Sequence, residues 1–101
     1  MSINNITFEI SDNDGRIYAI YDGKSVGSIF FIKIGIDKIM ISESEIDPSY
    51  KDSDIELNMV QQIIQIAREQ HRKVITISPY ISDIFKNHPE FDDVRLLNNG
   101  R

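Results

Sequence analysis

Carboxylates are concentrated where this sequence changes from strand-like to helix-like patterning. Asp52, Asp54 and Glu56 precede and enter an amphipathic segment that predicts a helix over residues 54–70. The first N–H groups of a helix have no acceptor within the helix, so they form a natural anion site. Carboxylates at this place would occupy those donors and repel a phosphate. The stretch therefore raises the question of whether an anion binds here or the protein's own acids replace it.

Two other interpretations of these acids remain open. Ser53 followed three residues later by Glu56 fits a capping box, and acids in a first turn stabilise a helix by about 0.3–1 kcal/mol each. Together with Asp47, the acids could also offer hard oxygen ligands to Mg²⁺ or Ca²⁺. Because the spacing lacks the glycine-containing calcium loop, we expect no metal site.

Two glutamates offer a proton acceptor. Glu43 and Glu45 lie two apart in a predicted strand over residues 37–46, so they share one face. Such a carboxylate could deprotonate an ammonium, or the pair could simply face solvent. Strict alternation places both on the face of Ile39 and Ile41, but a bulge or the end of the strand could break that register.

A serine and a tyrosine open a second predicted helix, over residues 78–87. Ser78 before Pro79 is typical of an N-cap, although its hydroxyl could instead bind a cofactor thiol or a substrate. Tyr80, in the first turn, could stack on a ligand or pack against the protein. No His/Asp base lies at a recognisable spacing from Ser78, so we do not expect a serine nucleophile.

The elements that must position these residues follow from the change in hydrophobic period. Strands are predicted at 3–10, 16–21, 25–34, 37–46, 73–78 and 94–97, with the two helices at 54–70 and 78–87. The order ββββαβαβ predicts an α+β fold. Its mixed sheet would start as an antiparallel meander, and the strand after the first helix would lie parallel to the fourth strand.

Composition limits the class of protein. The 101 residues form one expected domain, 1–101, with no cysteine and a formal charge of −5. The negative charge disfavours nucleic acid, and no apolar run is long enough to cross a membrane. The sequence lacks a signal peptide at its start, and we expect a cytoplasmic protein.

The order and residues together resemble the small, single-domain branch of the GNAT acyltransferase superfamily. The similarity covers roughly residues 17–97. It is strongest in "SPYISDIFKNHPEFDDV" at 78–94, with support from "IYAIYDGKSVGSIFF" at 17–31 and "IIQIAREQHRKVITIS" at 63–78.

The resemblance implies a fold and a cofactor. The fourth and fifth strands would splay apart, and acetyl-CoA would lie between them. Its pyrophosphate would sit on backbone N–H groups at the start of the long helix, in a loop that carries a Q/R-x-x-G-x-G/A pattern. The cofactor-binding residues implied in this way are Ile46, Lys51, Asp52, Ser53, Asp54, Ile55, Glu56 and Tyr80.

The sequence departs from the family pattern at these places. The loop reads "YKDSDIE" at 50–56, with no glycine and only Lys51 as a cation. Three acids facing two phosphate charges would cost about 4 kcal/mol before screening, of which Lys51 would offset roughly a third. Ser78 stands where the small branch commonly has a cysteine, and Glu43-Ser44 stand where a His-Thr pair is common.

Two functional hypotheses result. The first is an acetyl-CoA-dependent N-acyltransferase of small or protein amines, in which Glu43, Glu45 and Ser78 are the candidate catalytic residues. The second is a non-catalytic module with weakened or lost CoA binding, whose acidic surface binds a basic protein partner. The resemblance favours the first and the acidic loop favours the second.

Overall fold

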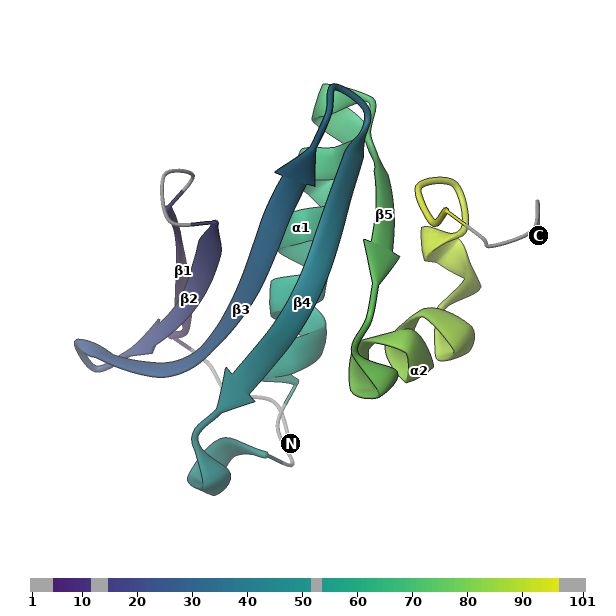
Figure 1. The fold of residues 1–101 in the computed structure, drawn as a ribbon. Helices are drawn as coiled ribbons and strands as arrows, with labels where there is room; N and C mark the ends of the chain where they lie inside the picture. Colours follow the sequence, from purple (N-terminus) through teal and green to yellow (C-terminus); the bar gives the residue numbers. More distant parts are fainter. Residues whose placement is uncertain (1–4, 12–14, 52–53, 97–101) are drawn as a thin grey trace.

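A five-stranded sheet with one long helix against its inner face forms the body of the computed structural model, which describes residues 5–11, 15–51 and 54–96 (Figure 1). The strands lie in the order β1-β2-β3-β4-β5. Their bounds are Thr7–Ser11, Arg16–Tyr21, Lys24–Ile34, Lys38–Ile46 and Lys73–Thr76. The first four are antiparallel and β5 is parallel to β4, so the predicted meander and crossover are confirmed.

The predicted last strand is much shorter than expected. Instead of a strand over 94–97, the chain makes a single parallel bridge between Val74 and Arg95. The Val74 N–H donates to the Val94 carbonyl at 2.6 Å, and the Leu96 N–H donates to the Val74 carbonyl at 2.9 Å. Residue 97 lies outside the described part of the chain. These two bonds hold the C-terminal segment along the free edge of β5.

The long helix α1, Ile55–Gln70, supplies six of the 18 buried apolar side chains in the described core. Its predicted apolar stripe is buried, because the inner face of the sheet presents large aliphatic side chains to it. The helix contributes Ile55, Met59, Val60, Ile63, Ile64 and Ala67. The sheet contributes Ile17, Ala19, Ile29, Phe31, Ile39, Ile41 and Val74. No helix in the described part of the chain is long and apolar enough to span a membrane.

The start of α1 corrects the capping prediction. Asp54 holds the N-cap position, so Ser53 lies one residue before the cap, and Glu56 is the second helical residue rather than the third. Ser53 itself lies outside the described residues. A capping box needs the glutamate at the third position, so Glu56 does not hold that position relative to the Asp54 cap.

The C-terminal segment is fastened to the far end of α1. The second helix, α2 (Pro79–Asn87), is followed by a short 3₁₀ turn, η2 (Pro89–Phe91). The Arg68 guanidinium donates to both carboxylate oxygens of Asp93 at 3.0 Å and to the Glu90 carbonyl at 2.9 Å. The hydrogen bond from Arg68, aided by its charge, lowers the pKa of Asp93 below the ordinary 3.8. This bidentate contact joins segments 25 residues apart in the sequence.

The lowered pKa of Asp93 predicts how stability depends on pH. A carboxyl with a depressed folded pKa contributes stability that is present above its unfolded pKa and is lost as pH falls through the folded value. Asp93→Asn should lower Tm at neutral pH, and the difference from wild type should shrink as pH falls below the ordinary pKa of 3.8. Thermal unfolding across this range measures it. Asp83→Asn, at an exposed acid of α2, is the control; equal pH profiles for the two variants would contradict the assignment.

Candidate functional site

The sheet opens where β4 and β5 part. The two strands pair from Lys38–Lys73 to Ile41–Thr76, and the last bond runs from the Ile77 N–H to the Ile41 carbonyl at 3.4 Å. The Thr76 hydroxyl donates to the same carbonyl at 3.0 Å, so this carbonyl marks the fork. β4 then continues to Ile46, and no described residue pairs with 42–46 on the β5 side. A backbone edge is therefore open beside the start of α1.

A β-bulge in β4 coincides with the fork. Phe30 pairs with Glu43 and Phe31 pairs with Ile41, so Ser42 is an extra residue on β4. The insertion reverses the alternation. Ile39 and Ile41 face α1, but beyond Ser42 the side chains of Glu43 and Glu45 are exposed. The prediction that Glu43 and Glu45 share the face of Ile39 and Ile41 is thus wrong, because a β-bulge breaks the alternation.

The bulge turns Ser44 toward α1, where it meets an acid of the loop. The Ser44 hydroxyl donates to a carboxylate oxygen of Glu56. Ile46, on the same inner face, is half-buried and comes close to Gly27 and Met59. A Cβ at Gly27 would lie 3.0 Å from the Ile46 side chain and 3.2 Å from that of Met59, so a glycine allows this close packing.

The acids of the loop differ in their hydrogen bonds and in their exposure to solvent. The Glu56 carboxylate accepts the hydrogen bond from Ser44 of β4, and Asp54 is exposed at the N-cap. Lys51 ends the 3₁₀ turn η1 (Pro48–Tyr50) and is also exposed, while Asp52 lies outside the described residues. Within the segments that the structure describes, no three Asp, Glu, His or Cys side chains gather as a metal-binding group.

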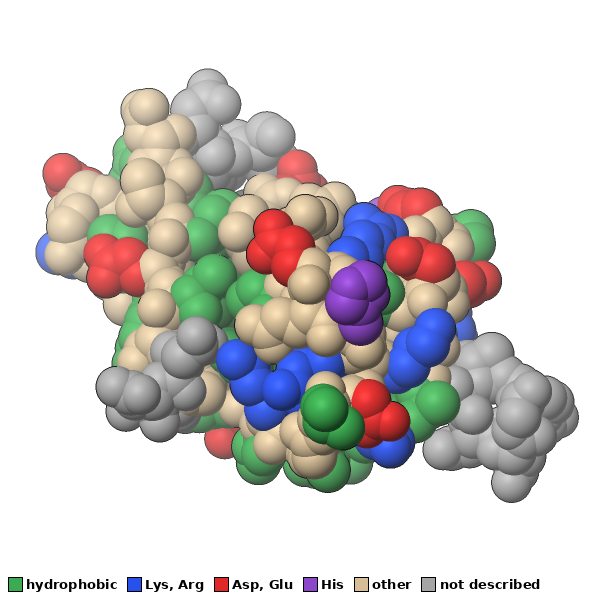
Figure 2. Space-filling model, turned by 90° about the horizontal axis from the view of Figure 1, so that it is seen from above, with side chains coloured by type: hydrophobic (Ala, Val, Ile, Leu, Met, Phe, Trp, Pro, Cys, Tyr) green, Lys and Arg blue, Asp and Glu red, His purple; other side chains and the backbone are tan. Residues whose placement is uncertain are grey.

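A group of basic residues lies at the opposite end of α1. Figure 2 looks down on that end and shows lysine and arginine side chains around a histidine. His71, Arg72 and Lys73 follow the helix there, and a 16-residue helix is about 24 Å long. Arg72 Nη1 donates to the carbonyls of Gly35 and Lys38, at 3.0 and 3.1 Å. Arg72 thus holds the β3–β4 turn, and the basic residues at this end are too distant to offset the acids at the helix start.

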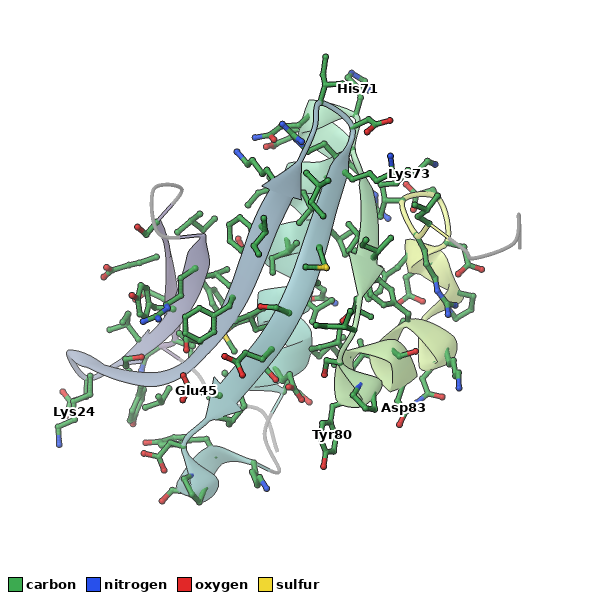
Figure 3. The ribbon with its side chains drawn as sticks, viewed as in Figure 1. Lys24, Glu45, His71, Lys73, Tyr80 and Asp83 are labelled. Carbon is green, nitrogen blue, oxygen red and sulfur yellow. The ribbon has the colours of Figure 1, made fainter. Side chains whose placement is uncertain are left out.

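The far side of the opening is the start of α2. Ser78 is the N-cap, and its hydroxyl accepts from the Ile81 N–H at 3.4 Å, which confirms the structural interpretation of this serine. Tyr80 is 75% exposed, so the packing interpretation of its ring is wrong. Figure 3 shows Glu45 and Tyr80 on opposite sides of the gap between β4 and α2, at the same end of the sheet.

A polar hollow on the outer face of the sheet was not predicted. It has a volume of about 420 Å³ and is lined by Arg16, Tyr18, Ser25, Val26, Gly27, Ser28, Glu45, Ile46 and Asp47. The Arg16 guanidinium lies over the Phe30 ring, with Cζ 3.8 Å from the ring centre. The sequence offered only the alternation of Arg16 and Tyr18 as a signal. Cross-strand register brings these residues to Glu45, and one strand alone does not show it.

The family comparison agrees with this geometry. The family model described as GCN5-related N-acetyl-transferase matches residues 16–94. The chain belongs to this family. The fold and the family expected from the sequence are therefore confirmed. The opening between β4 and β5 lies between the two strands that the GNAT resemblance predicted to splay apart. No curated protein matches the chain.

Solved structures show the same fold at low identity. The solution structure of a GCN5-like protein from Staphylococcus aureus has a TM-score of 0.71 and 14% identity; the match covers 96% of this chain and 95% of that one. A GNAT acetyltransferase from Elizabethkingia anophelis with acetyl-CoA bound has a TM-score of 0.60 and 10% identity, covering 75% and 51%. N-acetylglutamate synthase from Neisseria gonorrhoeae, complexed with coenzyme A and N-acetyl-glutamate, has a TM-score of 0.65 and 18% identity, covering 82% and 22%. The chain spans about half or less of the last two proteins.

The bulge predicts a strong effect of deleting one residue. Removing Ser42 would restore alternation and turn Glu43 and Glu45 toward α1, where an uncompensated carboxylate costs about 3 kcal/mol or more. Ser42→Ala keeps the bulge and removes only a 3.4 Å hydrogen bond to the Phe30 carbonyl, so it should cost about 1 kcal/mol or less. Urea unfolding of both variants measures the difference. Equal stability would show that the extra residue does not set the facing of β4.

Proposed function

We propose that this chain is an acetyl-CoA-dependent N-acyltransferase whose cofactor lies between β4 and β5. The observation that carries the proposal is the open backbone edge of residues 42–46 beside the start of α1, in a member of the GNAT family. Relatives with the same fold were solved with acetyl-CoA or coenzyme A bound.

The opening suits an extended chain that carries amide groups. Unpaired N–H and C=O groups along a strand edge bind such a chain as they would bind another strand. The first-turn N–H groups of α1 lie next to this edge and suit a phosphate. Because Ser44 holds the carboxylate of Glu56, this acid is tied to β4, and the obstruction is smaller than three free acids would cause. The residues that would hold the cofactor are Ile46, Lys51, Asp52, Ser53, Asp54, Ile55, Glu56 and Tyr80.

The chemistry assigned to this site is direct acyl transfer to an amine. Bound acetyl-CoA supplies an activated thioester. Glu43 and Glu45, on the outer face next to the opening, accept the proton that an ammonium must lose before its nitrogen can attack. A new C–N bond forms as the C–S bond breaks, and the thiol leaves. Ser78 positions the start of α2 through its N-cap bond and does not act as a nucleophile.

A second candidate is the non-catalytic acidic module that binds a basic protein. The exposed carboxylate of Asp54 at the helix start and the distance of most cations from it favour this candidate. The two candidates differ in one measurable property, which is stabilisation by the cofactor.

A thermal-shift titration with acetyl-CoA at low salt tests the proposal. A ligand that binds only the folded state stabilises by RT ln(1 + [L]/Kd), or about 1.4 kcal/mol at ten times Kd. For a domain of this size, that raises Tm by about 5–10 °C. A Tm that rises with acetyl-CoA, together with amine-dependent release of thiol, supports the transferase. No shift at millimolar acetyl-CoA would instead favour the non-catalytic module.

Removing acids from the loop should strengthen CoA binding. In the double variant Asp54→Asn, Glu56→Gln, asparagine still suits an N-cap and the glutamine amide can still accept from Ser44. Each acid repels a phosphate charge about 6 Å away by roughly 0.7 kcal/mol. CoA affinity measured by calorimetry should therefore rise about three- to tenfold, and the gain should shrink at high salt.

Glu69→Gln is the matched control for this charge change. It removes an exposed acid from the opposite end of α1, where it should leave CoA affinity unchanged. If the double variant binds CoA no better than wild type, or if the Glu69 variant gains as much, repulsion at the helix start does not limit affinity.

A further inference from the structure

We infer that the outer face of the sheet carries an acceptor subsite for a small amine that also bears a carboxylate, with Arg16 holding the carboxylate and Glu45 the ammonium. The inference rests on the proposed acyl transfer, because it names the class of amine that would receive the acyl group. Its evidence comes from residues on β2 and β3 that the proposed chemistry does not use, together with Glu45 of β4, which both share.

Arg16 has the features of an anion-binding group without its anion. Its guanidinium is stacked on Phe30, with Cζ 3.8 Å from the ring centre, and lies 5.4 Å from the ring centre of Tyr18. One end of the guanidinium, Nη1, donates to the Tyr18 hydroxyl at 3.1 Å. The Nε–H is buried and has no acceptor among the described residues, and a buried donor left in this way costs free energy.

A carboxylate is the acceptor that best fits this group. A guanidinium held flat on an aromatic ring presents its edge in a fixed geometry, and a carboxylate can accept from two of its N–H groups at once. No described acid comes within ion-pair distance of Arg16. Among the residues that the structure describes, the charge of Arg16 is therefore left for a ligand.

Glu45 lies across the hollow from Arg16. In the register of the sheet, Ser28 is opposite both Tyr18 and Glu45, so the three residues form one row over β2, β3 and β4. Two inter-strand spacings, about 9.5 Å, separate the Cα atoms of Tyr18 and Glu45 at the ends of this row. Arg16 lies two residues from Tyr18 on β2, in the neighbouring row with Phe30 and Glu43. Arg16 and Glu45 both line the hollow of about 420 Å³, and Ser28 between them is 8% exposed. A cation and an anion thus border the same small space.

This arrangement selects a molecule with both charges. An amine without a carboxylate is attracted by Glu45 and repelled by Arg16, and a carboxylate without an amine meets the reverse. A molecule that carries both groups satisfies both side chains at once, so the site discriminates by leaving a charge unpaired when one group is missing.

The position of Glu45 connects this subsite to the chemistry. Glu45 belongs to the part of β4 that has parted from β5, so an ammonium bound to it lies beside the edge assigned to the cofactor. The same carboxylate that attracts the ammonium can then accept its proton, which leaves a neutral amine for acyl transfer.

An NMR titration of the ¹⁵N-labelled 101-residue chain tests the subsite without any cofactor. The probes are glycine, β-alanine and 4-aminobutyrate, which differ in the distance between their two charges. Ethylamine and propionate serve as half-ligands, because each carries only one of the two charged groups. At least one amino acid should shift the amide signals of Arg16, Tyr18, Ser28 and Glu45. Its binding should be at least about tenfold tighter than that of either half-ligand, since each charged hydrogen bond contributes that much.

Variants assign the two ends of the ligand. Arg16→Gln should weaken the amino acid at least about tenfold and leave ethylamine unaffected or bound more tightly, and Glu45→Gln should weaken the amino acid and ethylamine together. Arg95→Gln is the matched control, because Arg95 also lies over a phenylalanine, with Cζ 5.8 Å from the Phe85 ring centre, but outside the hollow. Arg16→Lys keeps the positive charge but loses the paired N–H donors of the guanidinium, so it should bind the amino acid with intermediate affinity. This variant keeps the test usable even if Arg16→Gln folds poorly.

Three outcomes would overturn the inference: amino acids that bind no better than their half-ligands, shifts that map away from the hollow, or equal effects of the Arg16 and Arg95 variants. Because no cofactor is present, the result is independent of acetyl-CoA binding. Amino-acid binding at the hollow without any acetyl-CoA stabilisation would refute the transferase and leave the subsite standing. Acetyl-CoA stabilisation without amino-acid binding would refute only the subsite.

Discussion

The one extra residue in β4 is the constraint on which the candidate site depends. Ser42 shifts the register against β3 at the point where β4 separates from β5. Two consequences follow from this single insertion: the carboxylates of Glu43 and Glu45 face outward, and Ser44 faces the helix, where it bonds Glu56. The bulge therefore divides the acids of this region between an outer face suited to amine chemistry and an inner face beside the start of α1.

Charge is distributed unevenly along the long helix. The helix starts beside acids and ends beside cations, which suits its dipole and stabilises it. The arginines at the far end already have structural partners: Arg68 binds Asp93, and Arg72 binds carbonyls of the β3–β4 turn. Affinity for a diphosphate must then come mainly from backbone N–H groups. In this protein, the demands of helix stability and of cofactor binding oppose each other at one helix end.

The two binding regions that we propose lie on different faces of one sheet. The inner face of the sheet packs against α1. The outer face has no long helix over it, as the unobstructed strands in Figure 1 show. The stacked guanidinium of Arg16 over Phe30 lies on that outer face, separated from the helix by the sheet. Two binding regions can therefore meet at β4 without a second domain between them.

The sequence alone determined the elements of this protein, because hydrophobic period and local capping act over a few residues. The period-two segments became β1 to β5, the four-apart stripe became α1, and Ser78 before Pro79 began α2. The family was also identifiable from the residues at 78–94. Tertiary structure decided where side chains point. The facing of Glu43 and Glu45 depends on a register shift against another strand, and the meeting of Arg16 with Glu45 depends on pairing across β3. Cross-strand register is a non-local property of the sheet, so reading one strand at a time could not supply it.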